Sequence, residues 1–291
     1  MEIQTIGILS PGDMGHAIGA RLHRHGLRVI TSLAGRSART VRLAKEAGIL
    51  DMPDDAAIVQ ESDILLSILP PARAYACAER IATTLRQTGA SLLFVDCNAI
   101  APSTARSIDH LITEAGGSFV DAGIIGGPPG LDGQGPRLYV SGARAADVAY
   151  LQTYGLDVRV LGPRSGQASG LKMCYASVTK GLTALMTEAL VASQALDLQE
   201  ALLAEFQDLP YFSASKRSVI GMPPKAYRWV GEMEEIARTF ADLGLPPQTH
   251  QGAASLYHFI EGTVLGAETP EQRQHGPTLE EGMSILAAAL T

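Results

Sequence analysis

The stretch Ile6-Gly7-Ile8-Leu9-Ser10-Pro11-Gly12-Asp13-Met14-Gly15 decides the fold of this chain. Its apolar start predicts a buried strand over residues 5–9, and the residues after the turn predict a helix over residues 14–25. Glycines in such a turn let the backbone approach a phosphate group, which lies at the N-terminus of the helix. A full GxGxxG motif would have glycine at Ser10, so the motif is incomplete, and its place in the first turn of the chain is what favours nucleotide binding over a plain tight turn.

Further strands and helices alternate over the first half of the chain. We expect strands at residues 28–32, 63–69, 91–96, 118–122 and 138–141, and helices at 38–47 and 103–115. Continuous apolar strands that alternate with helices indicate an α/β fold with a parallel, doubly wound sheet, which is the Rossmann arrangement.

The pattern changes after Pro163, and only helices are expected beyond it. They cover residues 167–196, 224–243, 251–261 and 279–290, with a short capped start at 269–272. The sequence therefore predicts two domains, a Rossmann domain over residues 1–163 and an all-α domain over residues 164–291.

Composition excludes several classes of function. The 291 residues are 46% hydrophobic and 18% charged, which predicts a large packed core, and the net charge of −7 does not suit a nucleic-acid binder. No apolar run approaches the roughly 20 residues of a membrane span, and the N-terminus lacks the pattern of a signal peptide. The three cysteines form no CxxC pair, so we expect a cytoplasmic protein without a metal site.

Basic residues replace the acidic residue that NAD-binding folds carry after the second strand. No Asp or Glu lies between Asp13 and Glu46, whereas that interval holds seven basic residues. Some of them, such as Arg21 and Lys45, are expected on a solvated helix face. A guanidinium beside hydroxyl groups suits a 2′-phosphate, so Arg36 and Ser37 favour NADP over NAD.

Four segments in order resemble the β-hydroxyacid dehydrogenases, relatives of 6-phosphogluconate dehydrogenase. They are the opening stretch over residues 6–15, Leu66-Ser67-Ile68-Leu69-Pro70, Asp96-Cys97-Asn98-Ala99-Ile100-Ala101-Pro102, and Phe119-Val120-Asp121-Ala122 with Gly126-Gly127. A helix that begins near Gly166 and reaches Lys172 is similar to the catalytic helix of that family. The second half, with Lys172-Met173-Cys174-Tyr175-Ala176 and Trp229-Val230-Gly231-Glu232, resembles a branch of phosphogluconate dehydrogenase-like proteins with their own C-terminal domain.

The resemblance implies a set of site residues. Lys172 would be the general acid/base, since an apolar setting lowers the pKa of a lysine toward neutrality. Substrate contacts would come from Asn98, Gly126, Gly127 and Tyr175. The cofactor would contact Ser10, Pro11, Gly12, Asp13, Met14, Arg36, Ser37, Leu69 and Pro70.

Three positions depart from the family pattern. A serine usually precedes the two glycines, where this chain has Ile125, and an asparagine usually stands at Tyr175. A Lys-Asp pair usually stands at Gly231-Glu232. These changes keep the lysine of the catalytic helix but remove polar substrate contacts, so they favour a small-molecule substrate that is bulkier or more apolar than usual.

Two other functions stay open from the sequence. Imine reductases share this architecture but commonly lack the lysine that Lys172 represents. A non-catalytic NADPH sensor would fit the missing second lysine at Gly231, although a sensor needs no proton shuttle. The long apolar helix over residues 167–196 predicts a homodimer, as the resemblance also implies.

Overall fold

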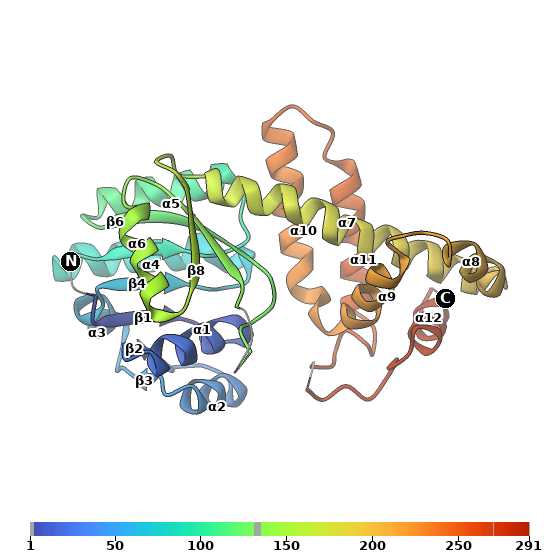
Figure 1. Cartoon of the computed structure of the whole chain (residues 1–291), viewed down its shortest axis with the longest axis horizontal. Coiled ribbons are helices and arrows are strands. Elements are labelled where there is room, and N and C mark those ends of the chain that lie inside the picture. Colours follow the sequence, from blue (N-terminus) through green and yellow to red (C-terminus); the bar gives the residue numbers. More distant parts are fainter. Residues whose placement is uncertain (1–2, 131–134, 270, 291) are drawn as a thin grey trace. The chain divides into compact units, whose positions relative to one another are not determined.

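The computed structural model describes residues 3–130, 135–269 and 271–290, and it divides into two compact units, Met1–Met173 and Cys174–Thr291. Helix α7 (Gln167–Ala195) begins in the first unit and continues into the second (Figure 1). The predicted boundary after residue 163 therefore lies just before this helix.

The first unit is built on one sheet. Among the described residues it has eight strands in the order β3-β2-β1-β4-β5-β6-β7-β8 (Figure 1). The strands are β1 (Thr5–Leu9), β2 (Arg28–Thr31), β3 (Leu50–Asp51), β4 (Ile64–Ser67), β5 (Leu93–Asp96), β6 (Ser118–Ile125), β7 (Arg137–Ser141) and β8 (Asp157–Gly162).

The strands from β3 to β6 pair in parallel, as the sequence predicts, but β7 pairs with β6 in antiparallel fashion. The expectation of a wholly parallel sheet is therefore wrong at this edge. A parallel pair needs a crossover of a dozen or more residues, usually a helix. Only residues 126–136 join β6 to β7, so the chain turns back along its neighbour.

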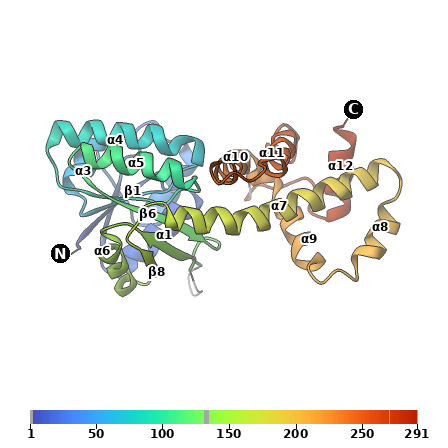
Figure 2. The same ribbon diagram turned by 90° about the horizontal axis from the view of Figure 1, so that it is seen from above.

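Helices cover both faces of the sheet. The six α-helices that the structure describes before α7 are α1 (Asp13–Arg24), α2 (Ala38–Glu46), α3 (Asp55–Glu61), α4 (Ala74–Thr88), α5 (Pro102–Glu114) and α6 (Ala145–Ala149). One core cluster unites the sheet with α1 and α6, including Ile18 and Val148. The other unites it with α3, α4 and α5, including Ile81 and Ile108, and Figure 2 shows the two layers of helices. This confirms the doubly wound arrangement.

The second unit is helical throughout its described residues, as predicted. Besides most of α7 it contains α8 (Gln199–Phe206), α9 (Phe212–Gly221), α10 (Ala226–Asp242), α11 (Gln248–Glu261) and α12 (Leu279–Ala288). The sequence did not predict α8 and α9. The expected helical start at 269–272 includes residue 270, which lies outside the described residues, and its neighbours are not helical. No helix in the described part of the chain is long and apolar enough to cross a membrane.

Candidate functional site

The turn between β1 and α1 leaves the N-terminus of α1 without a side-chain cap. Helix α1 has no side-chain cap in the described structure, so its first backbone N–H groups remain available to an anion. Ser10 has a φ of 66°, the left-handed conformation that glycine adopts in the full motif. A Cβ at Gly15 would lie 2.7 Å from the carbonyl oxygen of Ser10, so the loop and the helix approach closely. The backbone thus keeps the nucleotide-binding geometry although one glycine is missing.

Asp13, in the first turn of α1, is held by a side chain from another helix. Arg39 of α2 donates a hydrogen bond of 2.5 Å to its carboxylate. Asp13 lies between Gly12 and Met14, so this ion pair links the start of α1 to α2. Arg39 therefore tethers the loop, which the sequence did not predict.

Arg36 lines a cavity of about 350 Å³ at the end of β2. Ser32 and Gly35 line the same cavity, together with Asp54, Asp55 and Arg80. Arg80 pairs with Asp55, and Asp54 caps α3, so these charges are engaged. The Arg36 guanidinium has no ion-pair partner among the described residues. Arg36 is thus the lining cation of this cavity for which the described residues show no ion pair.

Ser37 has a local structural role. Its hydroxyl accepts a hydrogen bond from the amide of Thr40 at 3.3 Å and thereby caps α2. It does not line the cavity at Arg36, whereas Ser32 does. Sequence reasoning missed Ser32, although its place at the end of β2 was a usable signal.

Asn98 links the ends of two neighbouring strands. Its side-chain oxygen accepts from the amide of Leu69 at 2.5 Å, and its Nδ2 donates to Ser67 at 3.0 Å and to Asp96 at 2.9 Å. Asn98 is only 2% exposed. It therefore orders the segment with Leu69 and Pro70, and its amide group is already satisfied by the protein.

Asp96, at the end of β5, is buried beneath this network. Burial raises the pKa of its carboxyl to about 7, while the hydrogen bonds from Asn98 oppose the rise and the nearby Asp121 adds to it. The charge state of Asp96 consequently changes near neutral pH.

Asp121 closes the N-terminus of α7. Its Oδ2 accepts hydrogen bonds from the amides of Gly166, Ala168 and Ser169 at 2.9 to 3.0 Å and from the hydroxyl of Ser141 at 2.9 Å. Its Oδ1 accepts from the Ser169 hydroxyl at 2.5 Å. The carboxylate is fully buried, and the positive end of the helix stabilises it. Asp121 therefore fixes the helix that carries Lys172 to the centre of β6.

Lys172 lies over the carboxyl edge of the sheet. A Cβ on Gly123 of β6 would come within 3.0 Å of the Lys172 Cβ and 2.8 Å of the Ala168 carbonyl oxygen, so this close packing requires glycine. Strand β5 ends where Asp96 pairs with Asp121, and Gly123 lies beyond that point. Ligands of doubly wound sheets bind at this edge. The start of the Lys172 side chain is thus fixed against β6 at this edge.

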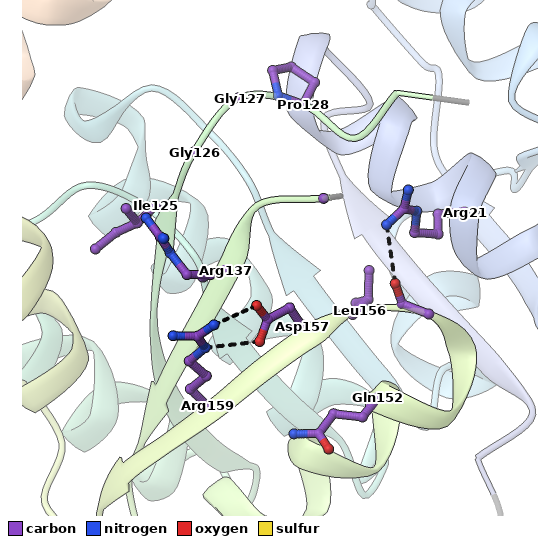
Figure 3. A pocket seen from close by; sticks show the side chains of 12 residues that line it. Arg21, Ile125, Gly126, Gly127, Pro128, Arg137, Gln152, Leu156, Asp157 and Arg159 are labelled. Atoms are coloured by element: carbon purple, nitrogen blue, oxygen red, sulfur yellow. Dashed lines mark hydrogen bonds and ion pairs between the residues drawn. The ribbon is translucent and has the colours of Figure 1, made fainter. Parts of the chain in front are cut away.

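Gly126 and Gly127 follow β6 and are exposed. Both line a cavity of about 780 Å³, beside Ile125 (Figure 3). Tyr175 belongs to the second unit and is 46% exposed. The glycines therefore lie on a cavity of the first unit, and the Tyr175 side chain is accessible.

The second unit contains a buried ion pair between Lys180 of α7 and Glu232 of α10. The Lys180 ammonium also lies 5.0 Å from the centre of the Trp229 ring. Tyr257 packs edge-on against Trp229 and donates a hydrogen bond of 2.6 Å to the carbonyl of Lys180. Glu232 thus stands at one of the positions that depart from the family pattern and holds a lysine of another helix, which ties α7, α10 and α11 together.

A family model confirms what the fold and these strand ends indicate. The NAD binding domain of 6-phosphogluconate dehydrogenase matches residues 5–153, which is more than half of the chain. The chain belongs to this family. Residues 193–260 match a domain of unknown function, DUF1932. This 6-phosphogluconate dehydrogenase-like chain is an oxidoreductase of the hydroxyacid dehydrogenase kind with a nicotinamide cofactor.

Two known proteins match this chain over most of its length. An uncharacterised 28.5 kDa protein of Methanothermus fervidus is 27% identical, over 88% of this chain and 98% of its own. A solved conserved protein of unknown function, described as structurally similar to 3-hydroxyacid dehydrogenases, is 28% identical with a TM-score of 0.63, covering 88% of this chain and 96% of its own.

Two further structures show the fold alone. The 3-hydroxyisobutyrate dehydrogenase of Mycobacterium tuberculosis, solved with L-serine, is 17% identical with a TM-score of 0.68, and the match covers 100% of both chains. An imine reductase of Streptomyces aurantiacus is 18% identical with a TM-score of 0.53, over 92% of this chain and 97% of its own.

Proposed function

We propose that the chain is an NADP(H)-dependent enzyme that oxidises the hydroxyl group of a β-hydroxyacid, or reduces the matching carbonyl, with Lys172 as the general acid/base. The observation that carries the proposal is the contact of Lys172 with Gly123 at the carboxyl edge of the sheet. The segment with Leu69 and Pro70 follows β4, which is separated from β6 by β5 and runs parallel to it.

When bound, the nicotinamide cofactor supplies the hydride chemistry. In the oxidative direction the neutral Lys172 amine takes the proton of the substrate hydroxyl while the carbon–oxygen double bond forms. In the reductive direction the Lys172 ammonium returns that proton to the carbonyl oxygen. Asp121 acts through position, because it holds the N-terminus of the helix that presents the lysine.

The preference for NADP rests on Arg36. Its side chain lines the cavity at the end of β2 with Ser32, and the described residues show no ion pair of Arg36 with the two aspartates of that cavity, Asp54 and Asp55. A fluorescence titration of wild type and Arg36→Ala with NADPH and NADH tests this preference. We expect the wild type to bind NADPH more tightly by about 10- to 100-fold, since charge-assisted hydrogen bonds contribute about 1.5–3 kcal/mol, and the variant to lose that difference.

Lys172→Ala tests the chemistry. A positioned general acid/base contributes about 10²- to 10⁴-fold to the rate, so turnover of a β-hydroxyacid with NADP should fall by that factor while NADPH binding stays the same. The matched control is Lys216→Ala, an exposed lysine on α9. A Lys172→Ala enzyme with wild-type kcat would exclude the proposed role.

The alternative function is an imine reductase. The solved imine reductase shares the fold of this chain, and enzymes of that kind commonly lack a lysine at the position of Lys172. A panel of cyclic imines and β-ketoacids, assayed with NADPH, separates the two. Faster reduction of the imines, insensitive to Lys172→Ala, would favour the alternative.

We also propose a homodimer that uses α7. Tyr175, Val178 and Leu185 are 46%, 67% and 57% exposed, and their spacing places them on one side of the helix. Such an apolar stripe is costly in water, and a second copy of the same helix would cover it. Sedimentation at micromolar concentration should show a dimer, and Val178→Glu should shift it toward the monomer.

A further inference from the structure

A cavity with several basic side chains lies in the first unit, between α5 and the residues that lead into α7 (Figure 2). Its volume is about 600 Å³. The residues that line it are Arg106, Asp109, His110, Arg164, Ser165, Gly166 and Gln167. None of these residues has a role in the proposed dehydrogenase chemistry, so the cavity needs an explanation of its own.

Two arginines reach this cavity from different segments. Arg106 belongs to α5, and a Cβ on Gly166 would lie 3.1 Å from its Nη1, so this guanidinium lies over the backbone at the start of α7. Arg164 belongs to the turn before α7, where its backbone N–H donates to the side-chain oxygen of Gln167 at 3.2 Å. The described residues show no ion pair for either arginine. Both guanidinium groups are therefore available to a ligand.

The carboxylate that lines the cavity is already engaged by hydroxyl groups. Asp109 accepts a hydrogen bond from the Ser165 hydroxyl at 2.6 Å and another from the Thr113 hydroxyl at 3.1 Å. The bond from Ser165 joins α5 to the turn that carries Arg164. The cavity thus sets two arginines against one carboxylate, and the ring of His110 adds a further hydrogen-bonding group. This excess of positive charge favours an anion.

The number of donors indicates the class of anion. One guanidinium presents a fork of N–H groups that the two oxygens of a carboxylate already satisfy. Two guanidinium groups on separate segments suit an anion with more oxygens and more charge, and a phosphoryl group has three free oxygens and a charge of about −1.5 to −2 at pH 7. Pockets of about 300–1,000 Å³ hold small organic ligands, so the phosphoryl group can belong to a larger molecule.

The N-terminus of α7 does not itself supply the donors for this anion. Asp121 already accepts hydrogen bonds from the amides of Gly166, Ala168 and Ser169. An anion held by Arg106 and Arg164 would instead link α5 to the turn before α7, in parallel with the bond from Ser165 to Asp109. The segment held in this way leads directly into α7.

We propose that this cavity binds a phosphoryl anion through Arg106 and Arg164, and that the bound anion holds the start of α7 against α5. His110 is a third group that faces the phosphoryl oxygens. The inference goes beyond the proposed function, because neither the cofactor nor a hydroxyacid is the ligand of this site, and binding does not depend on turnover.

Calorimetry on the complex with NADPH tests the site, since saturating NADPH keeps the probes from the cofactor site. The probes are glycerol 1-phosphate and inorganic phosphate, with acetate as a monocarboxylate. We expect a phosphoryl probe to bind with a Kd on the order of 1 mM or below, and acetate at least about 10-fold more weakly. Tighter binding of glycerol 1-phosphate would assign the site to a phosphomonoester, and tighter binding of inorganic phosphate would assign it to the free anion.

Arg106→Gln and Arg164→Gln should each raise the Kd of the phosphoryl probe by about 10- to 100-fold, as for one lost charge-assisted pair. Both side chains are exposed and lie on different segments, so if one variant does not fold, the other decides. In the wild type the bound probe should also slow hydrogen exchange at the amides of Arg164 and Ser165, and an unchanged exchange rate would overturn the link to α7.

Arg217→Gln is the matched control, because Arg217 is an exposed arginine of α9 outside the cavity. It removes the same charge and should leave the Kd unchanged. An equal loss of affinity in this variant would reveal a general effect of net charge and overturn the inference. So would a loss of binding in Arg137→Gln together with wild-type affinity in Arg106→Gln, since Arg137 lines the cavity beside Gly126. No binding of either phosphoryl probe up to about 10 mM would overturn it as well.

Discussion

Two helices that begin in the first unit have N-termini that are satisfied in opposite ways. Helix α1 starts at Gly12 without a side-chain cap, whereas the start of α7 is filled by the buried carboxylate of Asp121. A helix N-terminus attracts negative charge in both cases. The protein supplies that charge at α7, where a rigid helix must present Lys172, and leaves it to a ligand at α1. The same backbone chemistry therefore serves structure in one place and binding in the other.

Removing the carboxylate at α7 should have the largest effect. Asp121→Ala leaves three backbone amides and two hydroxyl groups without their buried acceptor, so we expect a loss of about 3–5 kcal/mol in the free energy of unfolding. Denaturant unfolding measures it. Asp109→Ala, which removes a partly exposed partner of Ser165 near the same helix start, is the control and should cost less than about 1 kcal/mol. Equal losses in the two variants would contradict the special role of Asp121.

Asp96 is a second buried carboxyl group, and it accepts fewer hydrogen bonds than Asp121 does. Its folded pKa of about 7 lies above its unfolded value, so the folded state holds the proton more tightly, and stability should fall as pH rises from about 4 to about 7. Asp96→Asn removes the ionisable group, so the free energy of unfolding of the variant should fall less as pH rises. We expect the difference from wild type to reach up to a few kcal/mol at pH 7. Thermal unfolding at pH 5 and pH 8 measures the difference. A wild-type pH dependence in the variant would refute the assignment.

The open N-terminus of α1 should be sensitive to small additions. Gly15→Ala places a Cβ 2.7 Å from the Ser10 carbonyl oxygen, so the loop must shift, and we expect a loss of about 1–3 kcal/mol in stability and weaker binding of NADPH and NADH alike. Gly252→Ala is the matched control, because this exposed glycine of α11 lies outside the loop and a Cβ there meets nothing within 4 Å. Titration with both cofactors shows whether the loss is common to them, as expected for a pyrophosphate contact.

Ser10→Gly should have the smallest effect. The left-handed φ of 66° costs a non-glycine residue about 1–2 kcal/mol, and part of the gain is offset by the greater freedom of glycine in the unfolded chain. We expect stabilisation by less than about 1 kcal/mol with unchanged NADPH affinity. A clear loss of affinity would mean that the Ser10 hydroxyl itself contacts the cofactor.

The sequence was most informative where a local pattern has one physical meaning. Apolar strands followed by glycine-rich turns predicted the Rossmann sheet, and the long apolar stretch from Gln167 predicted α7 nearly to its last turn. Two strands near the edges were missed, because β8 has a single buried residue, Val158, and β3 has only two residues, both of them exposed. The reversal at β7 was missed too, since direction depends on the length of a connection and not on the strand's own residues.

Within the candidate site, the sequence pointed to Lys172, Arg36 and Asn98 as residues of interest, and their partners came from elsewhere in the chain. Asn98 is satisfied by Ser67, Asp96 and Leu69, and the hydroxyl of Ser37 caps a helix. Asp121 carried a usable signal, because a charged residue within an apolar strand must find buried partners. Those partners follow it by some 20 to 48 positions.

The sequence by itself determined the alternation of strands and helices in the first half, the helical second half, the glycine-rich turn and the absence of an acidic residue after β2, since each depends on residues that are neighbours in the chain. Only the tertiary structure decided that Asp121 closes α7, that Gly123 admits Lys172, and that Arg106 and Arg164 line one cavity. These facts depend on strand register and on close packing between distant segments, and a hydrogen bond or a contact forms only when folding brings both partners within a few ångströms.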